Sequence, residues 1–98
     1  MGLEKKVGKY KEVKSPVVGT YYDSATSSSH EKYDPKPYVK IGSRVTPETV
    51  VCDIEAMKVI LPVKAGIDGI VKQKLVKNEE DVEYEQVLFR IKPTNKNK

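Results

Sequence analysis

"VKIGSRVTPETVVCDI", residues 39–54, recurs without a gap as "VKNEEDVEYEQVLFRI", residues 76–91. The two stretches place apolar residues at matching positions, with Cys52 in one copy meeting Phe89 in the other. Because side chains alternate between the two faces of a strand, each copy predicts a closing strand with one buried face. The internal repeat therefore predicts a fold built from two similar halves.

A second correspondence lies upstream of each copy. "VVGTYY", residues 17–22, aligns with "GIDGIV", residues 66–71, through Gly19 and Gly69. The spacing from this segment to the repeated stretch is longer in the first half, so the first half carries an insertion. The serine-rich residues 23–37, "DSATSSSHEKYDPKP", supply it.

Composition favours one small all-β domain. The chain has 98 residues, too few for two cores. Valine, isoleucine and tyrosine are frequent, which favours strands over helices. The repeat directs one set of side chains inward, and this predicted core is Val17, Val39, Val45, Val50, Cys52, Ile54, Ile67, Val82, Val87, Phe89 and Ile91.

Charge and rare residues exclude several classes of function. The formal net charge is +4, and lysines crowd both ends, so we expect residues 1–13 to be a flexible basic linker or tail and residues 94–98 a disordered basic tail. The single cysteine, Cys52, excludes an internal disulfide, and with the single histidine, His30, it leaves no metal site of sulfur and imidazole ligands. The chain has no apolar stretch long enough to span a membrane.

The joint between the halves falls at "IEAMKVILP", residues 54–62. Only a short connection separates the last strand of the first half from the strands of the second, which predicts a tight hairpin over residues 55–61 with Lys58 near its tip. The connection contains no glycine or asparagine, so turn chemistry alone does not indicate it. On these grounds alone, Lys58 is a solvated lysine.

A family resemblance gives this lysine a role. "VVCDIEAMKV" resembles the attachment segment of biotinyl domains, with Glu55, Ala56, Met57 and Lys58 matching the family's E-A-M-K and Val59 following. "SPVVGTYY", "YVKIGSRV" and "VEYEQVLFRIKP" resemble other strands of the biotin carboxyl carrier family of acetyl-CoA carboxylase. The resemblance covers residues 14–93.

The resemblance implies a fold. We expect a flattened β-barrel or sandwich, the biotinyl/lipoyl-like barrel-sandwich hybrid, made of two quasi-symmetric four-stranded halves. The insertion at residues 23–37 corresponds to the protruding thumb of this subclass, which contacts biotin in the family. The candidate thumb contacts are Thr26, Ser27, Ser28, Ser29, His30 and Tyr33.

The resemblance also implies a function. Lys58 is then the residue that a biotin protein ligase biotinylates, with Met57, Val59, Ala56 and Glu55 around it. A lysine amine is mostly protonated at neutral pH, so a separate enzyme must supply an activated acyl group. The domain would be a non-catalytic carrier that shuttles carboxybiotin from biotin carboxylase to carboxyltransferase for malonyl-CoA synthesis in fatty acid biosynthesis. We expect a monomer in a bacterial cytoplasm or a plastid stroma, with no nucleic-acid or membrane partner.

Two alternatives remain open at this point. A lipoyl domain of a 2-oxo acid dehydrogenase complex typically has aspartate before the modified lysine and alanine after it, so Met57, Val59 and the insertion favour biotin. The other alternative is an unmodified β-barrel that binds a protein or nucleic acid through its lysine tails. The chain has no tryptophan and one phenylalanine, which disfavours nucleic-acid binding, and its one histidine disfavours independent catalysis.

Overall fold

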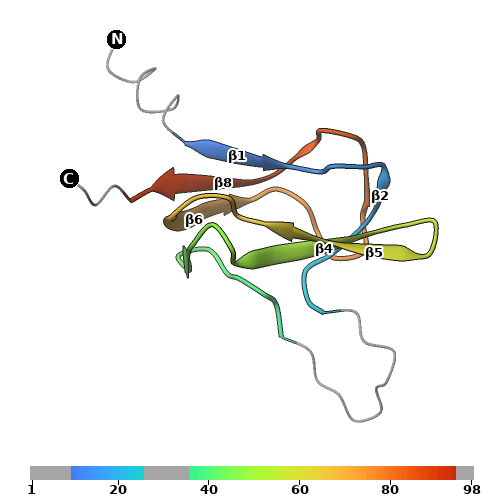
Figure 1. Ribbon diagram of the computed structural model, residues 1–98, viewed down its shortest axis with the longest axis horizontal. Helices are drawn as coiled ribbons and strands as arrows, with labels where there is room; N and C mark the ends of the chain where they lie inside the picture. The colour runs from blue at the N-terminus through green and yellow to red at the C-terminus, as the bar shows by residue number, and fades with distance from the viewer. Residues whose placement is uncertain (1–9, 26–35, 95–98) are drawn as a thin grey trace.

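The computed structural model describes residues 10–25 and 36–94. Within these ranges the chain forms eight strands in two four-stranded sheets (Figure 1). No helix among the described residues is long and apolar enough to cross a membrane. The strands are β1 (Lys11–Lys14), β2 (Gly19–Tyr22), β3 (Arg44–Val45), β4 (Val50–Ala56), β5 (Val59–Lys64), β6 (Gly69–Lys74), β7 (Asp81–Val82) and β8 (Val87–Pro93).

The strand order has the symmetry of the sequence repeat. One sheet runs β1-β8-β6-β3 and the other β5-β4-β2-β7, with antiparallel pairing in both. Replacing each strand by its counterpart in the other half converts the first order into the second. Each sheet therefore takes two strands from each half, and the predicted all-β fold of two quasi-symmetric halves is confirmed.

The symmetry extends to the turns. The Gly42 amide donates to the Val71 carbonyl at 2.8 Å, and at the equivalent place the Glu79 amide donates to the Tyr21 carbonyl at 2.6 Å. Both donors have left-handed backbones, with φ of 97° at Gly42 and 71° at Glu79. The second half thus keeps the turn geometry without the glycine that favours it.

The two aligned glycines mark a close approach of backbones. A Cβ on Gly19 would collide with the Glu55 carbonyl oxygen, and a Cβ on Gly69 would collide with the Lys92 carbonyl oxygen. In each half, the glycine lets its strand lie against the closing strand without steric conflict.

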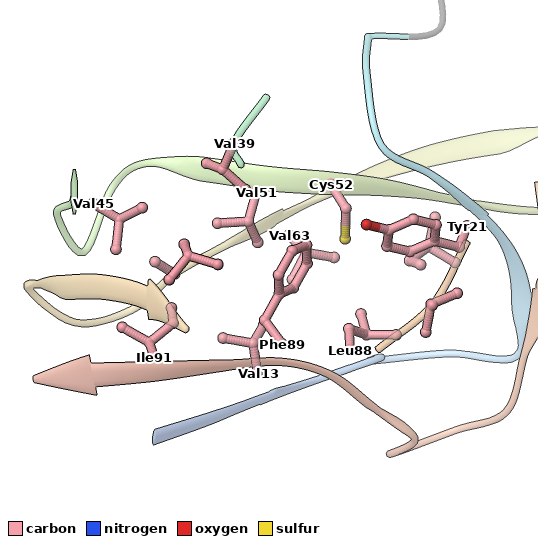
Figure 2. Packing of buried hydrophobic residues seen from close by; sticks show 14 of the residues in the cluster. Val13, Tyr21, Val39, Val45, Val51, Cys52, Val63, Leu88, Phe89 and Ile91 are labelled. Carbon is pink, nitrogen blue, oxygen red and sulfur yellow. The ribbon is translucent and has the colours of Figure 1, made fainter. Parts of the chain in front are cut away.

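The core fills the space between the two sheets (Figure 2). Val17 and Ile67, both predicted to be core residues, are partly buried and pack against it. The buried apolar residues are Val13, Tyr21, Val39, Val45, Val51, Cys52, Ile54, Val63, Ala65, Val71, Val76, Val82, Leu88, Phe89 and Ile91.

The sequence predicted strict alternation at the start of β4, with Val50 in the core, and this prediction is wrong. Val50 pairs with Lys64 and Cys52 pairs with Val63, so Val51 is an extra residue in the ladder. This β-bulge turns Val51 inward, where it is 1% exposed, and leaves Val50 only half-buried.

The prediction of Val87 as a core residue, at the start of β8, is wrong for the same reason. Val13 pairs with Phe89 and Lys14 pairs with Val87, which leaves Leu88 as the extra residue. Leu88 is fully buried and Val87 is half-buried. The repeat thus preserves the bulge as well as the strands.

The folded region starts earlier than the sequence indicated. β1 begins at Lys11, inside residues 1–13 that we expected to be a linker, because Val13 is buried against β8. At the other end, the Thr94 amide donates to the Asp68 carbonyl at 3.1 Å. The rest of both expected tails, residues 1–9 and 95–98, lies outside the described residues.

Candidate functional site

The joint between the halves is a two-residue hairpin turn. β4 and β5 pair as far as Ala56 and Val59, which leaves only Met57 and Lys58 between them. Their φ angles are 52° and 66°, as a type I′ turn requires at both central positions. The predicted hairpin is therefore present, with Lys58 at its tip.

Neither turn residue is of the type that favours this conformation. The left-handed region costs a residue with a Cβ roughly 1–2 kcal/mol, which explains the usual preference for Asn-Gly. Here pairing of β4 and β5 up to Ala56 and Val59 leaves two residues to close the hairpin, and the type I′ turn is the two-residue form that suits the twist of paired strands.

The tip is open to solvent. Met57 is 93% exposed and Val59 is 56% exposed, and Lys58 is exposed between them. Across residues 10–25 and 36–94, no partner forms a side-chain hydrogen bond or ion pair with Lys58. Its amine is thus accessible to a reagent or an enzyme that acylates primary amines.

Glu55 is held by the neighbouring strand. The Tyr22 hydroxyl in β2 donates to Glu55 Oε1 at 3.4 Å. Partial burial, and then the charge of the Glu55 carboxylate, raise the pKa of Tyr22. Sequence reasoning selected Glu55 and Ala56 but missed Tyr22, whose only signal is its place in the strand paired with β4.

Asp53 is a buried carboxylate on the outer side of the same sheet. Alternation directs it away from the core, yet it is only 4% exposed because Tyr38 covers it and donates its hydroxyl to Oδ2 at 2.9 Å. The Tyr38 amide also donates to the Asp23 carbonyl at 2.8 Å, so the two flanks of the insertion meet. The predicted thumb contacts Thr26, Ser27, Ser28, Ser29, His30 and Tyr33 lie outside the described residues.

The cysteine is placed as a packing residue. Cys52 has no solvent exposure, and burial, followed by the charge of Asp53, raises the pKa of its thiol to about 12. A thiol held neutral is a poor nucleophile and a poor metal ligand. Among the described residues, no three His, Cys, Asp or Glu side chains are arranged to hold a metal ion.

Comparison with known proteins agrees with this geometry. A family model described as a biotin-requiring enzyme, the biotin/lipoyl model, matches residues 11–91. The chain belongs to the biotin/lipoyl family. The match includes both halves of this biotin/lipoyl domain and the turn at their joint.

The domain is also similar to proteins named biotin carboxyl carrier protein of acetyl-CoA carboxylase. It is 41% identical to the protein of Chlamydia muridarum over 91% of this chain and 56% of the relative. Identity to the Nostoc sp. protein is 41% over 87% of this chain and 43% of the relative. Identity to the Pseudomonas aeruginosa protein is 35% over 81% of this chain and 47% of the relative. This biotin/lipoyl domain spans about half the length of the curated relatives it matches.

Proposed function

We propose that this domain is a biotin carboxyl carrier and that Lys58 is the residue that holds biotin. The observation that carries the proposal is the two-residue turn, which presents a lysine amine at the exposed tip of a hairpin, with no hydrogen-bond or ion-pair partner among the described residues. The names of the relatives support biotin as the attached group.

The attachment step needs only an accessible amine from this chain. Lys58 Nζ, once deprotonated, attacks the acyl carbon of biotinyl-adenylate on a biotin protein ligase. An amide C–N bond forms, the C–O bond to AMP breaks, and the second amine proton passes to solvent. The product is uncharged, so the exposed tip loses one positive charge.

The chain's own residues then act as a scaffold. Biotin, when attached, supplies a ureido nitrogen that accepts and releases a carboxyl group. The β4–β5 ladder keeps Lys58 clear of the barrel, while Met57 and Val59 stand exposed on either side of it. In this proposal the role of the domain is to carry the group between two enzymes, which supply the acids and bases of carboxyl transfer.

The partners follow from this role. They are a biotin protein ligase, a biotin carboxylase and a carboxyltransferase, and the product is malonyl-CoA for fatty acid synthesis. A short flexible tether would hold the carrier near its partner sites at an effective concentration of order millimolar. The relatives include proteins of bacteria and of the algae Porphyra purpurea and Pyropia yezoensis, which supports a bacterial cytoplasm or a plastid stroma as the location.

Intact mass after co-expression with a biotin protein ligase tests the proposal. The wild-type chain should gain the mass of one biotin amide and bind streptavidin, and Lys58→Arg should do neither. The matched control is Lys64→Arg, at the other end of β5, which should be biotinylated like the wild type because Lys58 and its turn are unchanged. Biotin on Lys58→Arg, or a wild-type chain modified only by a lipoate ligase, would contradict the assignment.

A further inference from the structure

Exposed apolar side chains gather on the hairpin that carries Lys58. Met57 is 93% exposed, Val59 is 56% exposed and Ile60 is 40% exposed. Val59 pairs with Ala56 and Ile60 pairs with Glu55, so Val59 and Ile60 point to opposite faces of the hairpin. Ile60 alone shares the face of Glu55, while Met57 projects from the turn itself.

A line of charge begins beside this apolar tip. Strand pairing aligns Asp81 with Thr20, Thr20 with Glu55 and Glu55 with Ile60, across β7, β2, β4 and β5. Directly paired residues point to the same side of a sheet, and these point outward because Tyr21, next to Thr20, and Ile54, next to Glu55, are buried. Ile60 therefore shares one face with two carboxylates.

A third carboxylate lies by the same face. Glu79 lies in the β6–β7 turn, where its amide donates to the Tyr21 carbonyl. Its charge raises the pKa of Tyr22 further, in addition to burial and the charge of Glu55. Asp81 and Glu79 are both exposed and Glu55 is half-exposed. We call Asp81, Glu55 and Glu79 the acidic row.

The quasi-equivalent face of the other sheet has the opposite charge. There Arg44 pairs with Ile70, and Ile70 pairs with Lys92. Arg44 is the counterpart of Asp81, and Lys92 is the counterpart of Glu55. One fold thus presents an acidic face beside the attachment turn and a basic face on the other sheet.

We propose that Met57 and Ile60, together with the acidic row, form the surface by which the carrier docks on the biotin carboxylase component of its complex. The proposal rests on the proposed function. An enzyme that draws anionic bicarbonate and ATP into its active site needs cationic side chains around the opening, and the acidic row complements such a rim. An apolar centre with a charged rim is the usual anatomy of a protein interface. The basic face would be repelled, so encounters with the turn foremost would be favoured.

The test is the carboxylation of biotinylated chain by an isolated biotin carboxylase, followed as ADP release. Glu79→Lys/Asp81→Lys should lower kcat/KM for the carrier about tenfold at about 0.01 M ionic strength, with kcat unchanged. The difference in kcat/KM between variant and wild type should disappear near an ionic strength of about 1 M, where screening reduces the Debye length to about 3 Å. Glu79→Gln/Asp81→Asn should give a smaller loss of the same kind, and this variant keeps the side-chain shapes.

The matched control changes the net charge equally on another part of the surface. Glu12→Lys/Asp68→Lys replaces two exposed carboxylates, one of them the ion-pair partner of Arg90 on the basic sheet at 3.3 Å, and should change kcat/KM less than twofold once urea unfolding shows the variant to be folded. Equal losses in both double variants, or a loss independent of salt, would overturn the docking surface. So would concentration-dependent self-association of the wild type that the Glu79→Lys/Asp81→Lys variant abolishes, because the occupant would then be a second copy.

The two proposals fail in different ways. A wild-type chain that takes biotin and is carboxylated, with variants as fast as the wild type, overturns only the docking surface. A chain that never takes biotin on Lys58 overturns both.

Discussion

The Cys52 thiol and the Tyr21 hydroxyl lie close together in the core (Figure 2). Burial dominates the rise in pKa of both groups, so the folded state favours their neutral forms. For Cys52 the stabilising contribution is complete below its ordinary value of 9.0 and is lost as the pH rises to about 12. Alkaline pH should therefore loosen this part of the core first through ionisation of the thiol.

Cys52→Ala should reduce the alkaline loss of stability. One group contributes at most about 1.4 kcal/mol per pH unit to the free energy of unfolding in its window. Urea unfolding at about pH 8 and about pH 10.5 should give a smaller difference for Cys52→Ala than for wild type. The variant should keep part of the alkaline loss of stability, because the buried Tyr21 hydroxyl still ionises in it. The same pH dependence in both proteins would show that the thiol does not contribute.

Gly19 offers a second test at this scale. Gly19→Ala should lower the free energy of unfolding by about 3 kcal/mol, because the added methyl meets backbone of β4 that cannot move aside. Gly42→Ala is the matched control: its φ is 97° but no atom lies within 4 Å of the new Cβ, so only the conformational cost of about 1 kcal/mol applies. Equal costs in urea unfolding would mean that β2 shifts to absorb the methyl.

At the scale of elements, the attachment turn is held against the preference of its residues. Met57→Asn should raise the free energy of unfolding by up to about 1 kcal/mol, because asparagine tolerates a φ near 52°. Met57→Val should lower it, since a β-branched side chain is disfavoured in this region. Urea midpoints of the three proteins give the order. A valine variant as stable as the asparagine variant would show that the turn relaxes to another form.

Local patterns explain how far the sequence could predict these elements. The sequence predicted β2 and β6 from the aligned glycines Gly19 and Gly69, and β4 and β8 from the repeated stretches. These strands could be predicted because close packing requires glycine and one-sided burial requires alternation, and both are visible in the local sequence. Val51 and Leu88 escaped prediction because a bulge adds one residue to the count, and apolar runs do not show where it lies.

The site shows the same division between local and distant signals. Lys58 was placed at a tip by its position between the halves. Tyr38 and Asp53 are far apart in the chain, and nothing in either stretch indicates their hydrogen bond. Glu79 and Glu85 have left-handed backbones, but neither position holds the glycine from which a sequence usually predicts such a turn.

For the whole molecule, the exchange of strands between the halves predicts a single unfolding step. Neither half can complete a sheet alone, because β1 and β3 pair with β8 and β6, while β5 and β7 pair with β4 and β2. Labelling of buried Cys52 in one sheet and amide exchange in the other should therefore report the same urea midpoint. Labelling well before exchange would mean that one sheet opens independently.

The attachment turn and the anchored ends of the sheet lie at opposite poles of the barrel. In Figure 1, β1 starts and β8 ends at one extreme, and the β4–β5 hairpin forms the other. Any chain joined to Lys11 or Thr94 would therefore be attached at the end of the barrel opposite the attachment turn. The barrel would then behave as a lever whose pivot is far from Lys58. A small rotation at the pivot would sweep the lysine through a wide arc, which extends its range without any lengthening of the tether.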